Sequence, residues 1–144
     1  MGQFRTAMNR VDDRLWMPNW LTAASDVVFR VALSLIFIIG GLGHFFAVDE
    51  MLERIAESPW HKQVLLIGDP AILLYLSGGV FVVFGLFLAA GILKRLSALT
   101  LFVTLVPITI AVHIAPGHVG PLLKNVAILG ALFLVYSKRE APVD

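Results

Sequence analysis

The sequence predicts an all-α fold, an integral membrane four-helix bundle with an N-terminal interfacial amphipathic helix. Of its 144 residues, 58% are hydrophobic and 15% are charged, whereas a soluble domain has about 45–50% apolar and about 25% charged residues. The apolar residues are gathered in four runs, and each run has the roughly 17–25 residues that a membrane-crossing helix needs. The net charge of +1 gives no reason to expect a nucleic-acid partner. The first partner is therefore the lipid bilayer.

The first element is an amphipathic segment over residues 1–24. Phe4, Met8, Val11 and Leu15 fall on one helical face, with arginines elsewhere. We expect this segment to lie on the cytoplasmic membrane surface.

Four membrane spans follow within residues 25–138, at about 26–46, 70–93, 95–114 and 121–137. Asp69 is the predicted N-cap of the second span, with Pro70 as its first helical residue. Pro107 cannot donate a backbone hydrogen bond, so the third span is expected to kink there. Pro121 begins the fourth span, and residues 139–144 form a cytoplasmic tail.

Two further patterns concern packing at the bundle. The segment 49–63, DEMLERIAESPWHKQ, is amphipathic and is expected to cap the bundle on its outer side. Small residues within the spans predict close helix–helix approach. They are Gly40, Gly41, Gly43, Gly78, Gly79, Gly85, Ala89, Ala127, Gly130 and Ala131.

The distribution of basic residues predicts the orientation of the bundle. Of the eleven Lys and Arg residues, eight lie before the first span, in its first turn, between spans two and three, or after span four. They are Arg5, Arg10, Arg14, Arg30, Lys94, Arg95, Lys138 and Arg139. The positive-inside rule then places both termini in the cytoplasm of a bacterial-type inner (plasma) membrane.

Four polar residues stand at similar depth near the expected outer boundary of the hydrocarbon: His44, His113, Lys124 and Asn125. His44 and His113 follow Arg30 and Arg95 by fourteen and eighteen residues, which corresponds to about 21 and 27 Å of helix rise. Any one of them can simply reach interfacial water or snorkel. Their convergence from three spans also predicts a shared ligand site.

The chemistry of that site has several readings. Two histidines can ligate a b-type haem if they face each other across a bundle. A zinc or di-metal site has less support, since cysteine is absent and no carboxylate lies deep within a span. A quinone or lipid headgroup fits the donors that His, Lys and Asn supply, with a greasy groove for the tail. We expect quinone or lipid and no metal.

Three stretches resemble the DoxX family of small four-span membrane proteins. They are the basic start and glycine-rich end of span one (FRVALSLIFIIGGLGHFF), the region GGVFVVFGLFLAAGILKRLSALTL, and His113 followed by the LKN sequence of Leu123, Lys124 and Asn125. The resemblance covers about residues 26–137. Many members have lysine at the position of His44, so the role of that position is carried over least directly.

The resemblance implies a bacterial or archaeal membrane protein without fixing one activity. Related DoxD-type proteins form the membrane part of a thiosulfate:quinone oxidoreductase, and other members are linked to redox-stress complexes. The sequence has no recognisable nucleotide, flavin or iron–sulfur motif. We therefore expect an accessory subunit of a larger redox-linked membrane complex, bound to other membrane subunits and not catalytic on its own. The alternative is a quinone-reactive subunit of a thiosulfate:quinone type oxidoreductase.

Overall fold

The computed structural model describes residues 18–114, 117 and 119–138. Over these residues the regular structure is entirely helical, with no strand, which confirms the predicted all-α class. Most of the predicted amphipathic segment, residues 1–17, and the predicted tail, residues 139–144, lie outside the described residues.

Four long helices form the body of the structure: α2 (Asn19–Phe46), α5 (Pro70–Ala90), α6 (Lys94–Ile108) and α7 (Val119–Ser137). The helix α6 continues into a π-helical turn, η2 (Thr109–His113). Four stretches of these helices are long and apolar enough to cross a membrane, namely Ala24–Phe46, Pro70–Ala90, Lys94–His113 and Val119–Ser137. Each predicted span falls on one of them, as expected for a multi-pass membrane protein.

The ends of α5 follow directly from its sequence. The Asp69 carboxylate accepts hydrogen bonds from the backbone N–H groups of Ala71 at 2.8 Å and Ile72 at 3.4 Å, and Pro70 occupies the first turn, as predicted. At the other end Gly91 adopts a left-handed conformation, with φ of 76°, which terminates the helix and which glycine reaches without steric cost. The helix therefore stops at Ala90, short of the predicted end near Leu93.

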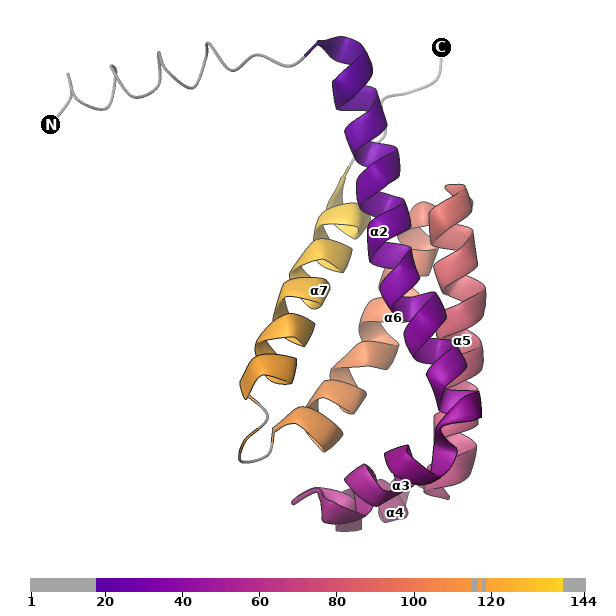
Figure 1. Cartoon of the computed structure of the whole chain (residues 1–144), viewed down its shortest axis with the longest axis vertical. Helices are drawn as coiled ribbons and strands as arrows, with labels where there is room; N and C mark the ends of the chain where they lie inside the picture. Colours follow the sequence, from indigo (N-terminus) through magenta and orange to yellow (C-terminus); the bar gives the residue numbers. More distant parts are fainter. Residues whose placement is uncertain (1–17, 115–116, 118, 139–144) are drawn as a thin grey trace, which may run out of the picture.

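The long helices associate in two pairs (Figure 1). The helix α2 packs mainly along α5, α6 packs against α7, and α5 also contacts α6. At one end of the bundle, Asp26 of α2 accepts a hydrogen bond from the Lys138 ammonium at 2.7 Å and pairs with Arg30 at 3.2 Å. The apolar core between the helices consists of Leu33, Phe37, Phe81, Leu88, Ala98, Leu101, Leu105, Ile128 and Leu132.

Glycines set the closeness of α2 to α5. A Cβ atom added to Gly41 would lie 2.8 Å from the carbonyl oxygen of Gly78, and one added to Gly78 would lie 2.8 Å from the Cβ of His44. The backbones therefore touch at this crossing, and His44 lies beside it. The predicted role of small residues applies to Gly41, Gly78 and Gly85, whereas added Cβ atoms on Gly40, Gly79 and Gly130 would meet no atom within 4 Å.

Two short helices, α3 (Val48–Glu57) and α4 (His61–Ile67), lie across the end of the bundle opposite Asp26 and Lys138 (Figure 1). The predicted amphipathic segment thus spans two short helices. Ser58 separates them with extended backbone angles, φ of −67° and ψ of 141°, because the following residue, Pro59, disfavours the helical conformation of its predecessor.

The amphipathic character of α3 is confirmed. Glu50, Glu53 and Glu57 are exposed, whereas Met51 and Ile55 are half-buried and line the space beneath the helix. This arrangement makes α3 and α4 a cover over the interior of the bundle at that end.

Candidate functional site

A cavity of about 440 Å³ lies beneath the α3–α4 cover, between α5 and the end of α6 with η2. Its volume lies within the roughly 300–1,000 Å³ that small-molecule sites occupy. Thirteen of its eighteen lining residues have apolar side chains. The other five are His44, Arg54, Ser77, Thr104 and His113. A largely apolar cavity with a few polar groups suits an amphipathic ligand.

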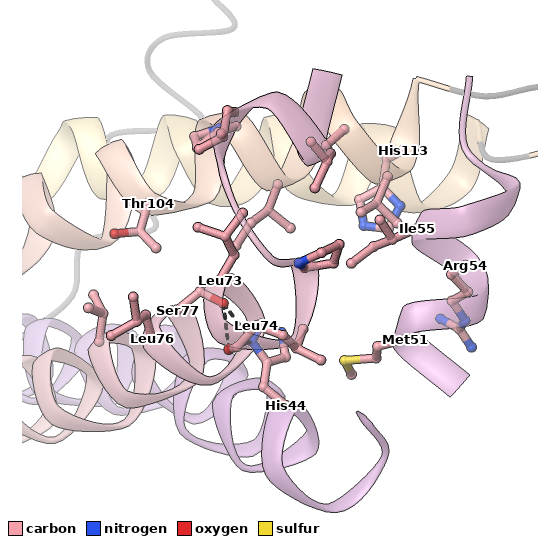
Figure 2. A pocket seen from close by; sticks show the side chains of 18 residues that line it. His44, Met51, Arg54, Ile55, Leu73, Leu74, Leu76, Ser77, Thr104 and His113 are labelled. Carbon is pink, nitrogen blue, oxygen red and sulfur yellow. Dashed lines mark hydrogen bonds between the residues drawn. The ribbon is translucent and has the colours of Figure 1, made fainter. Parts of the chain in front are cut away.

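His44 is the most constrained polar group of the cavity. Its side chain comes from α2, is buried, and packs at 5.5 Å, centroid to centroid, from the ring of Phe81. Its Nδ1 atom lies 3.2 Å from the carbonyl oxygen of Leu74 and 2.9 Å from the hydroxyl of Ser77, both on α5. Figure 2 shows these contacts at the edge of the cavity. The close α2–α5 crossing is what brings His44 within reach of them.

His113 lines the same cavity from a different element, at the end of η2 (Figure 2). The regular helix changes to the wider π form two residues after Pro107, at Thr109. Proline removes a backbone donor from the helical ladder, and π turns often occur at functional sites. The sequence predicted a kink at Pro107 but not this π turn, which begins two residues later.

Ser58 connects the cover to η2. Its hydroxyl donates a hydrogen bond to the carbonyl oxygen of Ala111 and accepts one from the backbone N–H of Trp60 at 3.1 Å. Ala111 also lines the cavity. The link between α3 and α4 is thus fastened to the wall that carries His113.

The other two predicted site residues lie away from the cavity lining. Asn125 is buried on α7, and its amide nitrogen donates to the Thr109 hydroxyl at 3.0 Å. That hydroxyl in turn donates to the carbonyl oxygen of Leu105 at 2.8 Å. Lys124 is exposed. The structure therefore brings His44 and His113 to one cavity, and it joins Asn125 by a hydrogen bond to η2, the element that carries His113. A ligand role for Lys124 and Asn125 remains a prediction.

Sequence reasoning did not select three polar residues of the lining: Arg54, Ser77 and Thr104. Arg54 is paired with Glu50 of the same helix at 2.6 Å. Ser77 and Thr104 stand within apolar spans, where any polar side chain needs an internal partner. This need for a partner was the signal that could have identified Ser77 and Thr104 from the sequence. It is a weak signal, because serine and threonine commonly find that partner within their own helix.

In the part of the chain that the structure describes, no group of three or more His, Cys, Asp or Glu side chains is placed to hold a metal ion. The two histidines of the cavity are accompanied by no carboxylate among the lining residues.

The family model described as DoxX matches residues 25–114. No curated protein and no solved structure matches the chain. The matched range includes most of α2, the α3–α4 cover, α5, α6 and η2, and thus every lining residue of the cavity, but it ends before α7 with Lys124 and Asn125. Because the match covers more than half of the sequence, this four-span membrane protein belongs to the DoxX family.

Proposed function

We propose that this chain is an accessory membrane subunit of a redox-linked complex and that it binds an isoprenoid quinone in the cavity beneath α3 and α4. The observation that supports the proposal is the composition of that cavity. Two histidines from different elements border about 440 Å³ of otherwise largely apolar space. A quinone needs polar partners for its ring oxygens and an apolar groove for its tail.

The position of the cavity along the membrane normal supports the same ligand class. It lies at the end of the bundle opposite Asp26, Arg30 and Lys138. If the basic end faces the cytoplasm, as the positive-inside rule favours, the cavity opens near the outer leaflet. Headgroups of quinones and lipids reside at such a boundary, so a ligand enters laterally with its tail in the bilayer.

The accessory role is inferred from the cofactor motifs that the sequence lacks. The sequence has no recognisable nucleotide, flavin or iron–sulfur motif, so electrons for a bound quinone would come from a partner subunit. The alternative is a quinone-reactive subunit of a thiosulfate:quinone type oxidoreductase. It is favoured by the two imidazole side chains beside one cavity, since histidine is the side chain that most often transfers protons in enzyme reactions. Thiosulfate-dependent quinone reduction by the isolated complex distinguishes this alternative.

The test uses a pair of tryptophan substitutions on α5. Val80 lines the cavity, whereas Val83 is 47% exposed on the outside of the helix. Protein purified in mild detergent is extracted with organic solvent, and the extract is analysed for quinones and lipids by mass spectrometry. We expect quinone with the wild type and with Val83→Trp, and much less with Val80→Trp.

Two results would overturn the proposal. Quinone recovery that is equal in the two tryptophan variants would place the ligand outside the cavity. Recovery of phospholipid in place of quinone, sensitive to Val80→Trp, would assign the cavity to a lipid. Identification of proteins that co-purify with the wild type tests the accessory role separately.

A further inference from the structure

The hydrogen bonds around His44 determine which ring nitrogen holds its proton. The Ser77 hydroxyl donates to the carbonyl oxygen of Leu74 at 2.9 Å. A hydroxyl has a single proton, so at its 2.9 Å contact with His44 Nδ1 the Ser77 oxygen is the acceptor. The Leu74 carbonyl, 3.2 Å from the same Nδ1, can only accept. All three contacts are satisfied only when Nδ1 has the proton.

The charge state of the ring follows from its surroundings. A cationic imidazole within hydrocarbon is costly unless an anion lies beside it. Among the described residues of the lining, the only charged side chain is Arg54, itself a cation, and none is a carboxylate. His44 is therefore neutral, and since Nδ1 is protonated, Nε2 has a lone pair and is a hydrogen-bond acceptor.

We propose that the cavity selects the reduced, hydroxyl-bearing quinol over the oxidised quinone, with the quinol O–H donating to Nε2 of His44. This inference rests on the proposed function and specifies its ligand. Both hydrogen bonds of His44 to α5 use Nδ1, which leaves Nε2 as the ring nitrogen for the ligand. A quinone carbonyl has no proton to offer and would set one lone pair against another. His44, the polar side chain held most firmly in the cavity, thus requires a ligand that donates a hydrogen bond.

Fatty alcohols also have a hydroxyl that can donate, so the aromatic ring of the ligand must be tested as well as its hydroxyl. Four probes separate these features: tetramethylhydroquinone, tetramethylquinone, the dimethyl ether of the hydroquinone, and dodecanol. Their affinities are measured on the protein in lipid nanodiscs, without oxygen. We expect the hydroquinone to bind about 2- to 10-fold more tightly than the quinone or the ether, as one hydrogen bond predicts.

The outcomes distinguish this inference from the proposed function. Failure of every probe to bind overturns both. Equal or tighter binding of the quinone overturns the quinol assignment and leaves the proposed function standing. Dodecanol binding as tightly as the hydroquinone would assign the cavity to lipid alcohols.

Two histidine variants locate the preference. His44→Phe removes the acceptor, so we expect the hydroquinone and quinone affinities to become equal. In His113→Phe the acceptor is intact, so the preference should persist even if both affinities fall. A preference lost in His113→Phe and kept in His44→Phe would overturn the assignment to His44.

The tautomer of His44 can be measured in the wild-type protein without any ligand. Imidazole ¹⁵N chemical shifts distinguish protonated from unprotonated ring nitrogens. The chain has four histidines, and the His44 signals are identified as those missing from His44→Phe. We expect a protonated Nδ1 and a bare Nε2. A proton on Nε2 in the wild type would refute the inference whatever the probes show.

Discussion

Gly78→Ala is the substitution whose effect can be worked out most directly from the structure. The added methyl group would lie 2.8 Å from the Cβ of His44, 2.9 Å from the carbonyl oxygen of Gly41 and 2.9 Å from the ring of Phe45. Comfortable contact begins at 3.5–4.0 Å, so α2 must move away by roughly 0.7–1.2 Å. Two of these three neighbours are the backbone or first side-chain atom of α2, which cannot rotate aside.

The expected steric cost is about 1–3 kcal/mol of unfolding free energy, the usual cost of forcing an extra methyl into a packed interior. Gly79→Ala is the matched control, because a Cβ on the neighbouring residue of the same helix meets no atom within 4 Å. Both substitutions gain the same helix propensity, about 0.8–1.0 kcal/mol. The difference between the two variants therefore isolates the steric cost.

The assay is reversible unfolding in mixed micelles with a rising fraction of sodium dodecyl sulfate, followed by circular dichroism. We expect Gly78→Ala to unfold at a lower fraction of that detergent than the wild type, and Gly79→Ala to unfold at the same or a higher fraction. Equal stability of the two alanine variants would refute the close α2–α5 crossing and with it the placement of His44.

Three further predictions concern the α3–α4 cover, the hydrogen bond of Asn125 and the membrane topology. Ser58→Ala removes the hydrogen bond to the Ala111 carbonyl, so amide hydrogen exchange in residues 109–113 should accelerate by about tenfold. The control is Ser137→Ala: the Ser137 hydroxyl bonds within its own helix, so its loss should leave exchange in residues 109–113 unchanged. Asn125→Leu removes one interhelical hydrogen bond and should cost about 0.6 kcal/mol, at most about 1.7; a loss above about 3 kcal/mol would mean that Asn125 has a further partner. In this cysteine-free chain, a single cysteine at position 94 should resist an impermeant thiol reagent in intact cells, and outside labelling there would reverse the proposed orientation.

The membrane spans could be predicted from sequence because bilayer thickness fixes their length and lipid forces their composition. Local signals also identified Asp69 as a cap and marked Pro107 as a position that disturbs the helix, two residues before the π turn begins. The amphipathic pattern of residues 49–63 did not include the break between α3 and α4, although its cause, Pro59 after Ser58, is local.

The site was harder to predict from the sequence because it depends on how each helix is rotated about its axis and on contacts between residues distant in the chain. Lys124 and Asn125 are neighbours on one helix, and successive residues point about 100° apart. One is therefore exposed while the other is buried against Thr109. The partnership of His44 with Ser77 joins residues 33 apart in the chain. It exists only because two glycines let α2 and α5 touch, and no periodicity of either helix encodes that register.

Photoaffinity labelling with an azidoquinone tests the central claim most directly, since it reports where a quinone resides on the intact chain. The protein in native membranes is irradiated with the probe, digested and mapped by mass spectrometry. We predict labels on the lining segments 44–55, 73–80 and 104–113, suppressed by excess tetramethylhydroquinone and by Val80→Trp. Labels spread over the exposed side chains of α7, such as Val126, Phe133 and Leu134, and unaffected by competitor would contradict it.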